Sequence, residues 1–84
     1  WGNEYVGTLI KTEQARRFGQ WLGNRYRDRP NLIWVMGGDD DPSGKAPLYR
    51  EFAMAVRSTD PRHLMTYHPN FHGSSSRWFH AAPW

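Results

Sequence analysis

Two stretches of the chain have apolar side chains at the three- and four-residue spacing that is typical of amphipathic helices. The first has Thr12 as its capping residue and ends at or before Arg29, because Pro30 follows. The apolar stripe of this stretch consists of Ala15, Phe18, Leu22 and Tyr26. The second begins at Pro47, which suits a first helical turn, and ends at the turn signal 58–61. Its apolar face consists of Leu48, Phe52, Ala55 and Val56.

Two glycines, Gly19 and Gly23, interrupt the first predicted helix. Each lowers helix propensity by about 1 kcal/mol relative to alanine. We therefore interpret them as sites of close packing against a neighbouring element.

Two short apolar runs fit β-strands. Residues 32–36 form a continuous run, which is typical of a strand buried on both faces, as in a parallel sheet. Residues 64–68 form the second run, and 37–46 read as a loop. After Pro69 the chain has no regular periodicity. A strand, a helix and a strand with short links predict a βαβ unit with parallel strands and a right-handed crossover.

Two strands and two helices are too few to cover both faces of such a sheet. We therefore predict an α/β fold in which the chain is a fragment of a (β/α)8 TIM-type barrel, or of an open α/β sheet. The chain has 84 residues, begins at Trp1 and stops at Trp84 without a terminating signal. We expect 1–84 to be a partial barrel catalytic domain, truncated at both ends.

Composition excludes several classes of function. The net charge is +3, and the one basic cluster, 25–29, is interrupted by Asp28, so no nucleic-acid partner is predicted. The chain has no Cys, which excludes disulfides and thiolate zinc sites. No apolar run approaches the roughly 20 residues that span a bilayer.

The strongest chemical signal is Asp39, which follows the first strand and a Gly-Gly pair. Active sites of α/β folds lie at the carboxyl ends of parallel strands. Because His68 ends the next strand, we expect it to lie near Asp39 on the same rim. Asp40 and Asp41, next to a proline, fit turn formers better. Glycoside hydrolysis requires two carboxyl groups, and no second acid falls at a predicted strand end.

Other polar residues leave alternatives open. His68, His72 and His80 with Asp39 could bind a metal, but no recognised metal motif is present and hydrogen-bonding histidines are favoured. Trp78 could stack on a sugar ring or pack on the barrel. For Phe79 packing is favoured. The three serines at 74–76 are not in a nucleophile-elbow motif.

Two segments carry a family resemblance: ARRFGQWLGNRYRDRPNLIWVMGGDDDP and DPRHLMTYHPNFHGSSSRWFH. Together they resemble the apiosidase-like glycoside hydrolases, which are bacterial (β/α)8-barrel enzymes. The resemblance extends from about Ala15 onward, and the linked set of motifs is far more specific than a lone Gly-Gly-Asp.

The resemblance implies roles for several residues. Asp39 matches the proposed catalytic acid/base at the end of the fourth barrel strand. The nucleophile of the family is a Glu near a later strand end and has no counterpart in this chain. His68, Trp78 and His80 match positions that line the sugar pocket. The two aspartates after Asp39 depart from the basic or polar residue that often follows Gly-Gly-Asp in the family.

The implied function is a retaining glycoside hydrolase that cleaves glycosidic bonds in side chains of plant-type polysaccharides, without a cofactor. The implied setting of the parent protein is secreted or periplasmic, and the fragment alone is expected to be inactive. Two alternatives stay open: a non-catalytic carbohydrate-binding barrel, if the parent lacks the Glu nucleophile, and a metal-dependent barrel hydrolase.

Overall fold

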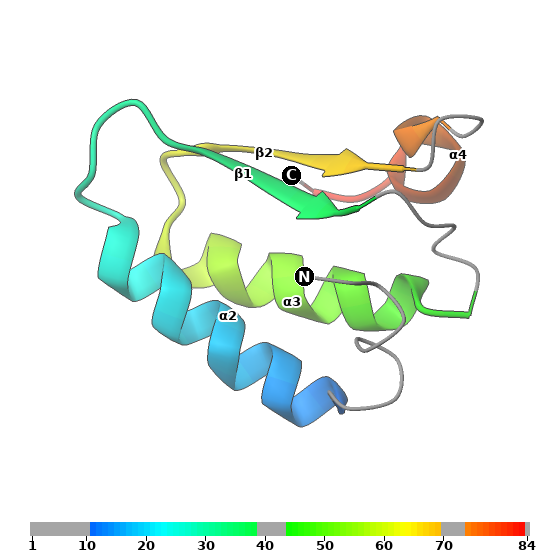
Figure 1. Cartoon of the computed structure of the whole chain (residues 1–84), viewed down its shortest axis with the longest axis horizontal. Coiled ribbons are helices and arrows are strands. Elements are labelled where there is room, and N and C mark those ends of the chain that lie inside the picture. The colour runs from blue at the N-terminus through cyan, green and yellow to red at the C-terminus, as the bar shows by residue number, and fades with distance from the viewer. Residues whose placement is uncertain (1–10, 39–43, 70–73, 84) are drawn as a thin grey trace.

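The computed structural model describes residues 11–38, 44–69 and 74–83; the side chains of Ser75 and Trp78 are also outside the described set. The described residues form an α/β unit with two strands (Figure 1). Its elements in chain order are α2 (Thr12–Tyr26), β1 (Ile33–Gly37), α3 (Ala46–Thr59), β2 (Leu64–His68) and α4 (Ser75–Phe79).

The two strands are parallel neighbours. Their register pairs Ile33 with Leu64 at one end and Gly37 with His68 at the other. Helix α3 connects them, so β1, α3 and β2 form the predicted βαβ unit. Helices α2 and α3 lie on the same side of the sheet (Figure 1).

Side chains alternate between the two faces of β1. Met36 is buried toward the helices, whereas Ile33 and Val35 are 60% and 57% exposed on the opposite face. In β2, Tyr67 is buried and Leu64 is 72% exposed. The run 32–36 is therefore open on its outer face in the described part of the chain, and its burial on both faces stays a prediction for a complete barrel. The physical reason for the open face is that the described helices cover only one face of the sheet.

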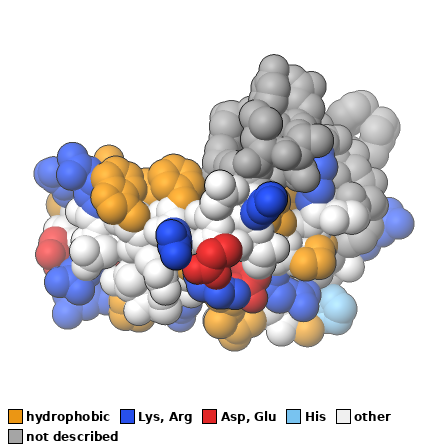
Figure 2. Space-filling model, turned by 90° about the horizontal axis from the view of Figure 1, so that it is seen from below, with side chains coloured by type: hydrophobic (Ala, Val, Ile, Leu, Met, Phe, Trp, Pro, Cys, Tyr) orange, Lys and Arg blue, Asp and Glu red, His pale blue; other side chains and the backbone are white. Residues whose placement is uncertain are grey.

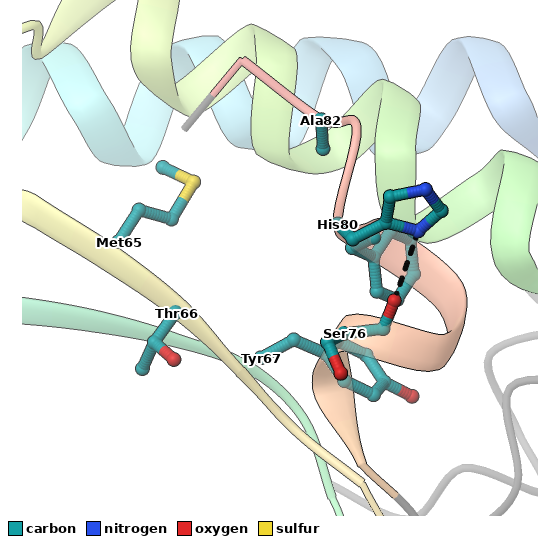
Figure 3. Close-up of a pocket in the computed structure, with 7 residues that line it drawn as sticks. Met65, Thr66, Tyr67, Ser76, His80 and Ala82 are labelled. Carbon is teal, nitrogen blue, oxygen red and sulfur yellow. Dashed lines mark hydrogen bonds between the residues drawn. The ribbon is translucent and has the colours of Figure 1, made fainter.

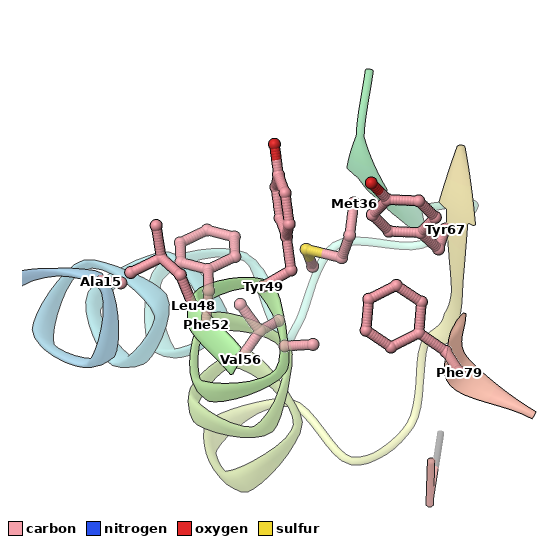
Figure 4. Packing of buried hydrophobic residues seen from close by; sticks show 9 residues of the cluster. Ala15, Met36, Leu48, Tyr49, Phe52, Val56, Tyr67 and Phe79 are labelled. Carbon is pink, nitrogen blue, oxygen red and sulfur yellow. The ribbon is translucent and has the colours of Figure 1, made fainter. Parts of the chain in front are cut away.

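The hydrophobic core lies between the sheet and α3 (Figure 4). The ring of Tyr67 is central to it: its centroid lies 5.4 Å from that of Tyr49 and 4.6 Å from that of Phe79. Phe52 and Val56 extend the core toward α2. The predicted packing role of Phe79 is confirmed, because its side chain is buried in this cluster.

Helix α2 packs on α3 through its smallest residues. A Cβ atom added at Gly19 would lie 2.7 Å from the backbone oxygen of Phe52, and one added at Gly23 would lie 2.1 Å from Thr59 Oγ1. The interpretation of both glycines as sites of close packing is confirmed. The buried residues of α2 are Ala15, Gly19 and Gly23.

Of the predicted apolar stripe of α2, Ala15 is buried as expected, whereas the larger side chains are only partly covered. Phe18 is 40% exposed, and Leu22 and Tyr26 are half-buried. Large side chains flank the contact because the glycines bring the two helix backbones close together. Figure 2 shows hydrophobic side chains among Lys and Arg on the face seen from below.

The ends of the elements differ from the predictions in detail. The residue that caps α2 is Lys11, not Thr12, and its backbone N–H donates to Gln14 Oε1 over 2.8 Å. Pro47 lies in the first turn of α3, as predicted. Helix α4 was not predicted, because five residues are too few to show a helical period. Within the described residues, no helix combines the length and apolar character needed to cross a membrane.

Candidate active site

The carboxyl ends of β1 and β2 meet at Gly37, Gly38 and His68. The N–H of Gly38 donates to the backbone oxygen of His68 over 3.1 Å, and His68 Nδ1 lies 3.4 Å from the backbone oxygen of Gly38. Gly37 has φ +88°, and a Cβ atom there would lie 2.6 Å from Tyr67 Cε2. Glycine is therefore required where β1 ends, for its backbone conformation and for the close approach of Tyr67.

His68 belongs to the open face of the sheet. Side chains alternate along a strand, and Tyr67, the residue before it, points into the core. His68 is exposed, and so is Thr66 two residues earlier. The structure thus presents an imidazole at the carboxyl end of β2, on the face that the helices do not cover.

Asp39 lies outside the described residues, as do Asp40 and Asp41. The residue that precedes Asp39 is Gly38, which is described and is hydrogen-bonded to His68. The expected proximity of Asp39 and His68 therefore stays a prediction. His72 also lies outside the described residues.

A second set of residues, from β2 and from the region of helix α4, includes polar side chains (Figure 3). It surrounds a cavity of about 250 Å³. The lining residues are Met65, Thr66, Tyr67, Ser76, Phe79, His80 and Ala82. His68 is not among the residues that line this cavity. The backbone of Trp78 is in α4, but its side chain is outside the described set.

The hydrogen bonding of His80 decides which ring nitrogen is available. His80 Nδ1 lies 3.0 Å from the backbone oxygen of Ser76, which can only accept, so Nδ1 carries the proton. In the neutral ring, Nε2 is then an acceptor. This arrangement suits a donor such as a sugar hydroxyl.

Ser76 and Thr66 are polar lining residues that the sequence reasoning did not single out individually. The Ser76 hydroxyl lies 2.8 Å from that of Ser74. In the sequence, Ser76 is marked only by the run of serines at 74–76. Thr66 is marked only by its place two residues before His68, on the same face of the strand. Among residues 11–38, 44–69 and 74–83, no three His, Asp or Glu side chains gather as a metal site would require.

Solved structures of glycoside hydrolases contain this α/β arrangement. One is described as a glycoside hydrolase and another as a glycoside hydrolase family 5 protein from Bacteroides vulgatus. Each is 37% identical to this chain with a TM-score of 0.91, and each alignment covers 100% of this chain. The chain spans 19% and 18% of their lengths. The fold is thus that of a piece of a glycoside hydrolase α/β barrel, as predicted.

The family follows from the sequence itself. Residues 1–84 match the family described as "Apiosidase-like, catalytic domain", and the chain belongs to this family. The resemblance recognised from the two motif-bearing segments is confirmed. No curated protein matches the chain.

Proposed function

We propose that the protein carrying this chain is a retaining glycoside hydrolase and that Asp39 is its acid/base. Membership of the apiosidase-like catalytic family supports hydrolysis of a glycosidic bond. The observation that carries the proposal is the pairing of Gly38 with His68 at the carboxyl ends of the two strands. Asp39 follows Gly38 directly, at the edge where parallel α/β sheets form their active sites.

In the proposed reaction, the carboxylic acid of Asp39 protonates the glycosidic oxygen as the bond to the sugar breaks. A Glu from a later strand end, outside these residues, attacks the sugar and forms a covalent intermediate. The Asp39 carboxylate then takes a proton from water, which releases the sugar and restores the acid. A retaining mechanism requires the two carboxyl groups to lie about 5 Å apart.

Three further residues are proposed to bind the sugar. His68 lies on the open face beside Gly38 and is placed to contact a hydroxyl group. His80 offers Nε2 as an acceptor beside the cavity of α4. For Trp78 we propose stacking of the indole on an apolar face of the sugar. The proposed substrate is a side chain of a plant-type polysaccharide.

The test is Asp39→Asn in the full-length protein, assayed with aryl glycosides. Loss of the acid/base should lower turnover by a factor of about 100 or more, and azide should restore product formation as a glycosyl azide because it needs no general base. Asp41→Asn is the matched control and should keep most activity. Retention of configuration in the first product, followed by NMR, tests the two-step mechanism. Near-normal turnover of Asp39→Asn would overturn the assignment, and sugar binding without any turnover by the unaltered protein would favour the carbohydrate-binding barrel.

A further inference from the structure

The amino-terminal ends of β1 and β2, opposite the candidate active site, are joined through His63. His63 directly precedes β2, Asp60 is the C-terminal cap of α3, and Arg29 lies in the turn between α2 and β1. His63 Nδ1 lies 2.5 Å from Asp60 Oδ2, and Nε2 lies 2.5 Å from the backbone oxygen of Arg29. A single imidazole ring therefore connects segments that are 34 residues apart in the sequence.

Both partners of this ring are acceptors. An ionised carboxylate and a backbone carbonyl can only accept hydrogen bonds, and neutral imidazole has one N–H. Only the doubly protonated imidazolium can donate to both at once. The two acceptors around His63 therefore favour the protonated, cationic form of its imidazole ring.

Asp60 supplies the matching negative charge. Its side chain has no exposed surface, and Trp34 Nε1 donates to the same oxygen, Oδ2, over 2.7 Å. A buried carboxylate with two donors is fixed in position, because a buried charge without partners is strongly destabilising. His63 in turn keeps only 13% of its side chain exposed.

Other charged groups lie around this cluster. Arg62, next to His63, opposes protonation of the imidazole. Asp60 and Arg62 also line a cleft of about 310 Å³ together with Arg27 and Asp28. The hydrogen bond to Asp60 raises the pKa of His63, burial lowers it, and the Arg29 carbonyl raises it again, with a net upward shift.

We propose that Arg29, Asp60 and His63 form a pH-sensitive latch (the His63 latch), which holds the turn 27–32 against the start of β2 while His63 is protonated. Deprotonation of His63 opens the latch. The carboxylate is the stronger acceptor, so Asp60 retains the proton on Nδ1. The lone pair of Nε2 then faces the oxygen of Arg29, and that contact changes from attraction to repulsion.

Two backbone features characterise the turn 27–32. The N–H of Arg29 donates to the backbone oxygen of Tyr26 over 3.0 Å, which ties this turn to the end of α2. Asn31 has φ +57°, a left-handed conformation that Asn tolerates better than most residues. Among the described residues, the side chain that bonds to the Arg29 oxygen is His63, so loss of this bond removes a direct link between the turn and the start of β2.

The test is hydrogen–deuterium exchange of the full-length protein as a function of pH, read in a peptide that covers 27–32. Protection factors, which remove the intrinsic pH dependence of exchange, should be constant below the pKa of His63. That pKa is the one of the open state; between it and the raised pKa of the latched state the protection factors should fall by up to tenfold per pH unit, the limit for release of one proton, and above the raised pKa they should level off. A peptide within α3 should show no such transition. Constant protection in 27–32 across the titration of His63 would overturn the proposal.

Two variants assign the transition to His63. Arg62→Gln removes the opposing charge and should move the midpoint to higher pH while leaving the fold intact, since Arg62 is exposed. His63→Gln should abolish the transition, and His80→Gln, a histidine outside the latch, should preserve it. Long-range ¹H–¹⁵N spectra of the His63 ring should show both nitrogens protonated below the midpoint. A singly protonated ring there, or a midpoint unmoved by Arg62→Gln, would refute the latch.

Discussion

Trp34 in β1 donates its indole N–H to Asp60 at the end of α3, with 2.7 Å between Nε1 and Oδ2. The two residues are 26 positions apart in the sequence. Their bond fixes the first strand to the helix that follows it, at the end of the sheet remote from the candidate active site. Asp60 is fully buried, so this donor bonds to a charge that water does not reach.

Replacing the donor should therefore destabilise the protein. We expect Trp34→Phe to lower the free energy of unfolding by about 1–3 kcal/mol, because a buried acceptor loses a partner. Urea denaturation followed by circular dichroism measures the change. Trp21→Phe is the matched control: Trp21 is 56% exposed, and its replacement should change the free energy by less than about 0.5 kcal/mol. Equal effects of the two substitutions would show that the bond contributes nothing.

The carboxylate of Asp60 should make stability fall in acid. Burial by itself would raise the pKa of Asp60, but the hydrogen bonds from Trp34 and His63 outweigh burial and hold the pKa below its usual 3.8. A depressed folded-state pKa stabilises the protein above the unfolded-state pKa, and this contribution is lost as pH falls through the folded-state value. We expect the free energy of unfolding to decline below pH 3.8.

Two variants separate Asp60 from the other acids in that experiment. Asp60→Asn should be less stable at neutral pH and should show a shallower decline in acid. Asp28→Asn removes a carboxylate that is 87% exposed and should leave the acid profile as it is. Identical acid profiles for Asp60→Asn and the unaltered protein would contradict the assignment.

The contact between α2 and α3 predicts a severe effect of one methyl group. A Cβ atom at Gly23 would lie 2.1 Å from Thr59 Oγ1 and 2.6 Å from the backbone oxygen of Val56. Since a backbone atom cannot move aside without shifting α3, we expect Gly23→Ala to cost about 1–3 kcal/mol, despite the better helix propensity of alanine. Thermal unfolding measures it. Asn24→Ala, on the exposed face of α2, is the control and should be neutral or slightly stabilising. A similarly small effect of Gly23→Ala would show that the two helices do not pack closely at this position.

Removal of the His68 imidazole should affect activity more than folding. His68 is exposed at the carboxyl end of β2, so His68→Ala leaves no cavity in the core. We expect kcat/KM of the full-length enzyme to fall about tenfold or more, which corresponds to about 1.4 kcal/mol of lost interaction with the sugar. The unfolding temperature should stay within about 2 °C, and Asn24→Ala serves as the control for activity. Unchanged kcat/KM would remove His68 from the substrate site.

Local patterns predicted the main elements well. The three- and four-residue spacing and the prolines located α2 and α3, and the short apolar runs located β1 and β2 almost to the residue. Their order alone predicted the parallel pairing, because two strands linked through a helix have few other ways to form one sheet. The short helix α4 escaped detection, since a single turn and a half has no period to recognise.

Long-range packing was harder to predict. Phe18 fits an apolar stripe as well as any buried residue, yet it is 40% exposed, and the backbones of α2 and α3 approach closely at Gly19 and Gly23. Asp60 fits a stop signal after a helix and in fact caps α3, but no sequence pattern indicates that its carboxylate is buried between Trp34 and His63. A spacing rule describes one element at a time and contains no information about which atoms of a distant element lie opposite.

For this protein the sequence by itself determined the two long helices, the two strands, their order and the family, because these depend on local preferences and on linked motifs. It also placed Asp39 and His68 after successive strands. Only the tertiary structure decided that Gly38 and His68 are bonded neighbours and that His80 lines a cavity with Thr66 and Ser76. It likewise decided that both ring nitrogens of His63 face hydrogen-bond acceptors. Each of these properties depends on distances between residues far apart in the chain, and those distances are set by packing of the whole unit.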